Sequence, residues 1–322
     1  MPLKKIIFIV GPTAIGKTQV AFVLAQKVAG EIVSCDSMQI YKEITITSNK
    51  PSSQVLKKIP HHLIDIVSVE EEFDVAAYYR LAVRAVNAIH KKNKIPIVAG
   101  GSGMYMQVLL DGIFESGPKN LKLRQELEQK AVEKGNDYLY EELKMVDPQA
   151  AAKIHPHDTR RIIRALEVFL SDKKPISELQ KEREGLWGKF DIAVFALNCP
   201  RENLYARINE RVDKMFTKGL VKEVQRLSHL PLSQTARNLI GVKEVLGFLN
   251  AEYGLERAQY LMKLNTRHFA KRQLTWFRKD KRLKWIMLVK DDTPATVTNK
   301  ILEEIKTFGN LHQRILSKRN LI

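Results

Sequence analysis

A glycine-rich loop near the start of the sequence has the residues needed to hold a phosphate group. Residues 11–18 read GPTAIGKT and fit the pattern G-x-x-x-x-G-K-[ST] without a mismatch. In such a loop, successive backbone N–H groups surround an anion at a helix N-terminus, the lysine adds a positive charge, and the last hydroxyl can bind Mg²⁺. The candidate phosphate-binding residues are Gly11, Pro12, Thr13, Ala14, Ile15, Gly16, Lys17 and Thr18, and Thr18 is the candidate metal ligand. The pattern leaves open which molecule carries the phosphate.

A carboxylate follows the next apolar run. Residues 31–36 read EIVSCD, a strand pattern that ends at Asp36. An aspartate in this position can bind Mg²⁺ through water or act as a general base on a nucleophile, although it can also be an ordinary turn or N-cap residue. Its place one strand away from the phosphate loop favours a functional role. The strand pattern at 96–101, PIVAGG, ends in glycines, so the acidic pair typical of nucleotide hydrolysis is missing.

Two arginines after Pro200 could bind a further anion. Arg207 and Arg211 are four residues apart in a helical pattern, so they lie on one face of the helix. Two guanidinium groups on one face can bind an oxyanion or stabilise a departing diphosphate. A solvated basic helix face explains the same spacing equally well.

A second arginine cluster opens another predicted helix. Arg160, Arg161 and Arg164 lie in its first turns, where the helix dipole disfavours positive charge, so an external anion would offset that cost. His155 and His157 precede the cluster without an acidic or cysteine partner at metal-ligand spacing. We therefore favour loop or RNA contacts over a zinc site.

The stretch 263–284, KLNTRHFAKRQLTWFRKDKRLK, combines nine Lys or Arg residues with one Asp and three aromatic residues. Cations with interleaved aromatic rings suit phosphate contacts combined with stacking on unpaired bases. The competing interpretation makes Phe269, Trp276 and Phe277 the core face of a helix whose cations face solvent.

The overall composition agrees with a polyanionic partner. The 322 residues include 53 Lys or Arg against 36 Asp or Glu, a formal charge of +17; a generally basic soluble enzyme is the alternative. Cys35 and Cys199 are far apart, which favours a reduced compartment. The apolar run before the loop is too short for a signal sequence or a membrane span, so we expect a cytoplasmic protein.

Alternating strand and helix patterns predict the fold class. The order of strands and helices with short connections predicts an α/β protein with a doubly wound parallel sheet. The predicted elements are strands at 6–10 and 31–36, a strand within KIPIVAGG at 94–101, a possible strand at 61–67, and helices at 17–29, 74–92 and from about 102. Because ligands bind beyond the carboxyl ends of such strands, we expect Thr18, Asp36 and the segment 100–102 to meet at one edge.

The pattern changes after residue 114. Residues 1–114 form the first part of the predicted core, 115–190 a helical insertion, and 191–322 the completion of the core with a basic, helical C-terminal region. The predicted elements are helices at 121–134, 137–145, 158–170 and 298–316, and strands at 191–200 and 284–289.

The ordered motifs resemble one known family, the tRNA dimethylallyltransferases, also called tRNA isopentenyltransferases, whose core is P-loop NTPase-like. The matching segments run from Val10 to about Arg278. They read GPTAIGKT, SCDSMQIY, PHHLIDI, GGSGMYMQVLLDG, HPHDTRRIIRALEV, RINERVDKMFTKGLVKEV, LIGVKEV and TRHFAKRQLTWFR.

The resemblance implies transfer of a dimethylallyl group from its diphosphate to N6 of the adenine immediately 3′ of the tRNA anticodon. By this likeness Asp36 is the base on the attacking amine, Thr18 holds diphosphate and Mg²⁺, and Arg211 neutralises the departing diphosphate. The implied tRNA contacts, on the anticodon stem-loop, are Asp36, Ser37, Met38, Gln39, Arg160, Arg161, Ile162, Ile163, Arg164, Asn238, Leu239, Ile240, Gly241, Val242 and Lys243, with Ser102 and Arg124 assisting near the channel.

The sequence departs from the family pattern in three places. Residues 41–51, YKEITITSNKP, lack two glycines and an acid that the family usually has there, while Ser102 and Val242 replace the usual Thr and Tyr. An ATP-dependent small-molecule or nucleotide kinase with a helical lid is the alternative function, and a non-catalytic nucleotide-binding RNA protein is a third. We expect a monomer, because the partner is large.

Overall fold

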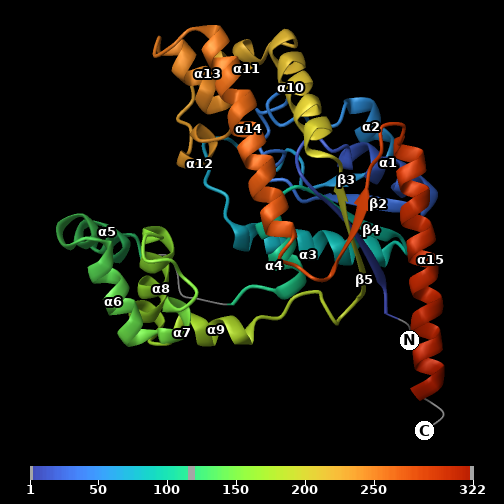
Figure 1. Cartoon of the computed structure of the whole chain (residues 1–322), viewed down its shortest axis with the longest axis horizontal. Helices are drawn as coiled ribbons and strands as arrows, with labels where there is room; N and C mark the ends of the chain where they lie inside the picture. The colour runs from blue at the N-terminus through green and yellow to red at the C-terminus, as the bar shows by residue number, and fades with distance from the viewer. Residues whose placement is uncertain (1–2, 115–119, 320–322) are drawn as a thin grey trace. The chain divides into compact units, whose positions relative to one another are not determined.

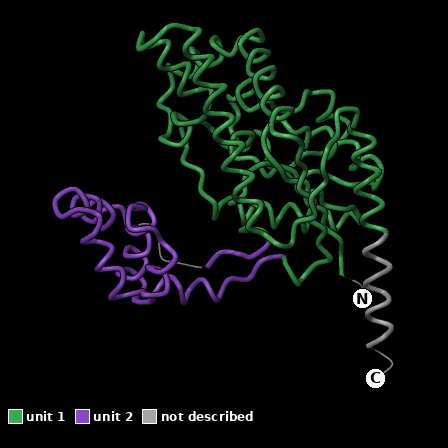
Figure 2. The backbone as a smooth tube through the Cα atoms, in the orientation of Figure 1, with its two compact units in different colours: residues 1–109, 187–322 green, residues 110–186 purple. Residues whose placement is uncertain are grey.

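The computed structural model describes residues 3–114 and 120–319 and contains two compact units (Figure 1). Residues 1–109 and 187–322 form the first unit and residues 110–186 form the second, as the two colours of Figure 2 show. The helical insertion expected at 115–190 overlaps the second unit, and its expected start at 115 lies outside the described residues.

One parallel sheet organises the first unit. In the described residues it has six strands in the order β3-β2-β4-β1-β5-β6. Their bounds are β1 Lys5–Val10, β2 Gly30–Ser34, β3 His61–His62, β4 Ile95–Gly100, β5 Asp191–Asn198 and β6 Leu283–Met287. Every neighbouring pair is parallel, which confirms the predicted doubly wound α/β sheet.

The edge strand β3 is much shorter than the stretch 61–67 that the sequence allowed. Leu63 and Asp65 adopt left-handed backbone angles, with φ of 63° and 56°, so the extended conformation ends after His62. Strand β2 likewise ends at Ser34, two residues before Asp36. Asp36 therefore belongs to the loop that follows the strand.

Alternate residues of the central strands face helices on one side of the sheet. Ile7 and Ile9 of β1 pack in one cluster with Val20 and Leu24 of helix α1 (Lys17–Lys27) and with Ile301 of α15 (Pro294–Arg319). All five side chains are essentially inaccessible to solvent, so they anchor α1 directly behind the phosphate loop.

The remaining helices of the first unit pack on the sheet or in a second apolar cluster. Helix α3 (Val75–Lys91) contacts β2 and β4, and Asp74 caps its N-terminus with a carboxylate that accepts a hydrogen bond from the Ala77 N–H. The others are α2 Ser53–Lys58, α10 Arg201–Thr217, α11 Leu220–Leu227, α12 Gln234–Arg237, α13 Val242–Leu249 and α14 Leu255–Phe277. All of these except α2 contribute residues to the second cluster. Helix α4 (Gly103–Asp111) follows β4 and leads out of the unit.

The second unit is helical and has its own apolar core. Its elements are α5 Leu121–Lys134, α6 Asn136–Val146, α7 Pro148–Ala151, α8 Thr159–Asp172, α9 Ile176–Leu179 and a 3₁₀ turn at Gln180–Glu182. Buried Asp147 joins two of them, because its carboxylate accepts hydrogen bonds from the N–H groups of Ala150 and Ser177. The two ends of the unit meet, since Gly112 lies against the backbone of Glu184 and Gly185 against that of Leu110.

No helix in the part of the chain that the structure describes is long and apolar enough to cross a membrane.

Candidate active site

A cavity of about 400 Å³ opens at the carboxyl ends of the strands in the first unit. It brings together the phosphate loop, the segment after β2, the turn after β4, the loop after Tyr41 and two helices from the second half of the chain. The lining residues include Thr13, Lys17, Thr18, Asp36, Ser37, Met38, Gln39, Gly100, Gly101, Ser102, Arg207, Arg211, Phe269 and Gln273. The predicted meeting of Thr18, Asp36 and the segment 100–102 is confirmed.

The phosphate loop has the backbone geometry of an anion cradle. Gly11, Ala14 and Gly16 have positive φ angles of 146°, 64° and 99°. A Cβ at Gly11 would lie 2.6 Å from the carbonyl oxygen of Leu197, so this position requires glycine. Lys17 begins helix α1 and donates a hydrogen bond from Nζ to the Pro12 carbonyl at 2.8 Å, which closes the loop.

The electrostatics of the loop favour an anionic ligand. Burial is the largest influence on Lys17 and lowers the pKa of its ammonium group to about 8; Asp36 opposes this shift and Arg211 adds to it. Burial also lowers the pKa of Arg211, again opposed by Asp36. An anion between these two cations would stabilise their charged forms.

Helix α10 delivers its paired arginines to the phosphate loop. Arg211 donates from Nη1 to the Thr13 hydroxyl at 2.8 Å, and Arg207 approaches the Ile15 carbonyl at 3.5 Å. Both side chains line the cavity. Their spacing therefore serves the site and is not only a solvated helix face.

Asp36 lines the cavity from a turn fixed by its neighbours. Its Oδ1 accepts the Met38 N–H at 2.9 Å, so the aspartate does stabilise a turn while it borders the cavity. The preceding residue is held against strand β4 and the turn after it: the Cys35 N–H donates to the Ala99 carbonyl, and the Ser102 N–H donates to the Cys35 carbonyl. Burial raises the pKa of the Cys35 thiol to about 12, which keeps it protonated and excludes it as a thiolate nucleophile.

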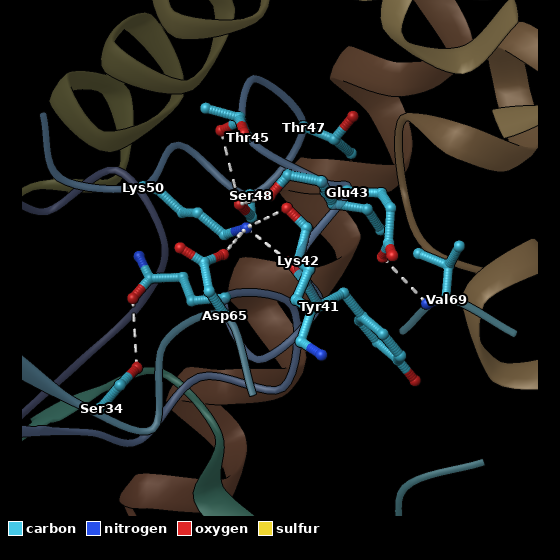
Figure 3. Close-up of polar contacts among 12 residues, drawn as sticks. Ser34, Tyr41, Lys42, Glu43, Thr45, Thr47, Ser48, Lys50, Asp65 and Val69 are labelled. Carbon is cyan, nitrogen blue, oxygen red and sulfur yellow. Dashed lines mark hydrogen bonds and ion pairs between the residues drawn. The ribbon is translucent and has the colours of Figure 1, made fainter. Parts of the chain in front are cut away.

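The loop at 41–50, which departs from the family pattern, is ordered by its own side chains (Figure 3). The Lys50 side chain is 4% exposed; it pairs with Asp65 and donates to the carbonyl groups of Tyr41 and Lys42. Glu43 accepts a hydrogen bond from the Val69 N–H at 3.0 Å. These contacts close the base of the loop.

The tip of the same loop binds a buried carboxylate of helix α11. Glu223 accepts hydrogen bonds from the backbone N–H groups of Thr45, Ile46 and Thr47 at 2.7–2.9 Å and from the Thr47 hydroxyl at 2.7 Å. Glu223 is only 3% exposed. Glu223 thus anchors the tip of the loop. Its partners lie about 176 residues earlier in the chain, so the sequence carries no signal of its role.

The segment 238–243 lies beside this loop, and its residues have different environments. Asn238 and Lys243 are exposed, whereas Val242 is fully buried in the core formed with α10, α11 and α14. Gly241 is also buried, and a Cβ there would lie 2.8 Å from Cγ2 of Thr47. Burial corrects the expectation of tRNA contact for the Val242 side chain; Leu239 and Ile240 are half-buried.

The arginine cluster of the second unit is partly neutralised from within. Glu167 is 2% exposed and accepts hydrogen bonds from Arg124 at 2.6 Å and Arg164 at 3.1 Å, while Arg161 pairs with Asp158, the N-cap of α8. These carboxylates, rather than only an external anion, offset the charge at the helix N-terminus. Arg160 and Arg161 are exposed.

Two neighbouring residues expected at tRNA belong instead to the core of this unit. Ile162 and Ile163 are 0% and 5% exposed and pack in the apolar cluster of α5–α9. Their side chains are therefore unavailable for tRNA contact. Nearby, the rings of His155 and His157 are 5.3 Å apart, and no group of three or more His, Cys, Asp or Glu among the described residues could hold a metal ion.

The aromatic residues of the basic stretch 263–284 serve different purposes. Phe277 is fully buried, so for this ring the interpretation as part of the core face is confirmed and base stacking is excluded. Trp276 packs against Gly103, and Phe269 lines the cavity. The polar residue of this helix that reaches the phosphate loop is Gln273, which the sequence did not single out.

This arrangement defines the class of the protein. It is an α/β protein whose phosphate loop, paired arginines and carboxylate share one cavity at the carboxyl ends of the strands of a parallel sheet. The family model described as IPP transferase matches residues 39–280. The chain belongs to the IPP transferase family.

Curated relatives and solved structures agree with this assignment. The chain is 43% identical over 304 residues to the tRNA dimethylallyltransferase of Halothermothrix orenii, covering 94% of this chain and 91% of the relative. It is 42% identical over 310 residues to that of Alkaliphilus oremlandii, covering 95% and 99%. The full-length tRNA isopentenylpyrophosphate transferase of Bacillus halodurans matches with a TM-score of 0.68 and 34% identity over 96% of this chain and 99% of that one. A eukaryotic dimethylallyltransferase acting on tRNA matches with a TM-score of 0.77 and 33% identity over 88% and 74%.

Proposed function

We propose that this protein transfers a dimethylallyl group from dimethylallyl diphosphate to N6 of the adenine immediately 3′ of the anticodon in tRNA, releasing diphosphate. The observation that carries the proposal is the single cavity that contains the phosphate loop, Arg211 and Asp36. The names of relatives more than 40% identical over nearly the whole chain support it.

The proposed reaction breaks the bond between the allylic carbon and diphosphate and forms a bond from that carbon to N6. The bonding electrons leave with diphosphate, and the proton lost from N6 goes to the Asp36 carboxylate. An adenine amine is a poor nucleophile, but an allylic diphosphate ionises readily once its leaving charge is neutralised. Lys17 and Arg211 supply this neutralising charge from the cavity wall.

A magnesium ion fits the donor set of the cavity. The Thr18 hydroxyl and the Asp36 carboxylate line the same space, and Mg²⁺ prefers oxygen ligands. Bound there with diphosphate, it would neutralise part of the leaving group's charge. We propose Thr18 as the protein ligand.

We also propose tRNA as the binding partner of the protein. The exposed arginines Arg160 and Arg161 and the formal charge of +17 suit a tRNA backbone. The target base must leave its stack to reach the cavity. We expect a cytoplasmic monomer, and light scattering of the purified protein measures the oligomeric state.

Incubation with radiolabelled dimethylallyl diphosphate, Mg²⁺ and unmodified tRNA tests the proposal. Label is expected in tRNAs with adenine 3′ of the anticodon and is expected to be absent when that adenine is replaced. Absence of label from every such tRNA would contradict the proposal. ATP consumption with a small acceptor would instead favour the kinase alternative, which the relatives do not support.

A further inference from the structure

Gln273 of helix α14 lies between two loops of the candidate active site. Its Oε1 accepts a hydrogen bond from the Thr13 N–H at 2.8 Å, and its Nε2 donates to the Gly101 carbonyl at 2.8 Å. The residue is 6% exposed, and a Cβ at Gly101 would lie only 2.3 Å from Nε2. The glycine therefore lets the amide reach the backbone of both loops.

The chemistry of these contacts requires an amide. A backbone N–H can only donate and a backbone carbonyl can only accept, so the two partners fix the orientation of the Gln273 side chain. A carboxylate can accept from Thr13 but has no proton to donate to Gly101. An apolar side chain of similar length makes neither bond.

The two loops carry the two halves of the proposed reaction. On one side, Thr13 belongs to the phosphate loop, and its hydroxyl binds Arg211. On the other side, Gly101 precedes Ser102, whose N–H holds the carbonyl of Cys35 next to Asp36. Gln273 thus connects the side that binds the leaving group to the side that holds the carboxylate for the amine.

We propose that Gln273 is a positioning residue that sets the separation between the diphosphate cradle and Asp36; this inference rests on the proposed function. The attacking amine and the allylic carbon must meet at near-bonding distance. A displacement of about 1 Å between the two sides can lower turnover on the order of 100-fold while each substrate still binds.

A purely structural role of Gln273 predicts a loss of stability without a loss of kcat. If Gln273 only packed helix α14 against the sheet, its replacement would lower thermal stability and the fraction of active protein. The folded fraction would then keep the normal kcat. Positioning predicts a lower kcat per folded molecule with little change in KM for either substrate.

The experiment compares Gln273→Met, which removes both hydrogen bonds at similar volume, with Gln273→Glu, which removes only the bond to Gly101. Gln54→Glu makes the same chemical change at an exposed residue of α2 that does not line the cavity. Measurements are kcat and both KM values with dimethylallyl diphosphate and tRNA, thermal melting, and amide hydrogen exchange at Thr13 without substrate.

We expect Gln273→Met to lower kcat on the order of 100-fold and to speed exchange of the Thr13 amide, which its Oε1 partner protects in the unsubstituted protein. Gln273→Glu should also lower kcat, and Gln54→Glu should match the unsubstituted protein. A normal kcat for folded Gln273→Met would overturn the proposal, because turnover would then not depend on the two hydrogen bonds. If kcat fell only in Gln273→Glu, the introduced charge would be the cause of the loss, and the proposal would also be overturned. If the unsubstituted protein transfers no prenyl group, the proposed function fails, whatever the variants do. Hydrogen exchange at the Thr13 amide needs no reaction, so it tests the Gln273 contact independently of the proposed function.

Discussion

Arg211 of helix α10 donates a hydrogen bond to the hydroxyl of Thr13, 198 residues earlier in the chain and 2.8 Å away. This contact holds a guanidinium group at the mouth of the phosphate loop before any ligand arrives. Burial lowers the pKa of Arg211, so the group gains most from an anion that replaces its lost hydration. The guanidinium group is therefore held in place by the protein itself.

Replacement of Arg211 by Gln is expected to lower kcat for prenyl transfer on the order of 100-fold, because the developing diphosphate charge loses a preorganised donor. Steady-state kinetics with labelled donor measure this effect. Arg257→Gln, an exposed residue of α14, is the matched control and should keep normal kinetics. An equal effect of both variants would indicate nonspecific damage instead.

Replacement of Asp36 by Ala is expected to lower transfer by roughly 100- to 10,000-fold, because the attacking amine loses its general base. Binding of tRNA, measured by filter retention, should remain largely intact. Asp291→Ala at an exposed position is the control. Loss of tRNA binding without a separate catalytic defect would show that the assigned role is wrong.

Glu223→Gln is expected to destabilise the protein by about 1–3 kcal/mol, because an amide nitrogen would face backbone N–H donors that now bind a carboxylate. Urea denaturation measures the difference in unfolding free energy. The exposed Glu128→Gln in the second unit makes the same change without comparable contacts and should be close to neutral. A stability equal to that of the unsubstituted chain would contradict the role of Glu223 as an anchor of the loop 45–47.

The contribution of Glu31 to stability should depend on pH. Burial raises its pKa, but hydrogen bonds from His62, Lys94 and Lys92 outweigh burial and lower it from 4.5 to about 2. A lowered carboxylate pKa stabilises the fold above pH 4.5, and this contribution is lost as the pH falls toward 2. After solvent screening of the two lysines, we expect roughly 2 kcal/mol.

Urea denaturation of Glu31→Gln beside the unsubstituted chain, at neutral pH and at about pH 3, isolates this contribution. The stability gap should narrow in acid. A gap that stays constant or widens would contradict the assigned pKa shift.

Arg160→Ala is expected to weaken tRNA binding and to reduce the slope of log affinity against log salt by about 0.7–0.9, the value for one phosphate contact. Arg160 is exposed at the start of α8, so its removal should leave the fold intact. Binding measured at several salt concentrations tests this, with exposed Arg257→Ala on α14 for comparison. An unchanged slope would exclude a phosphate contact by Arg160.

The sequence predicted what is local and periodic. The phosphate loop is contiguous, and residues 6–10 of strand β1 form an uninterrupted apolar run, so both were readable without a structure. Strand β3 was overestimated because left-handed backbone at Leu63 ends an apolar stretch that still reads as a strand.

The residues that the sequence missed act through distant partners. Glu223 and Gln273 are a polar residue on a helix and an amide within a basic stretch, and neither type signals a role. Their partners lie about 176 and 260 residues away in the chain, so only the fold reveals the contacts. Conversely, Ile162 and Val242 were carried over from a motif that does not distinguish a core side chain from a ligand contact.

The helical unit begins and ends at one point, where Gly185 lies against Leu110. A segment with adjoining ends can be inserted or deleted as one piece without changing the strand order of the sheet that it interrupts. The same property makes the second unit an exchangeable module. Exchange of residues 110–186 with a relative needs only two junctions. The exchanged unit would bring Arg124, Arg160 and Arg164 together into the α/β unit of that relative.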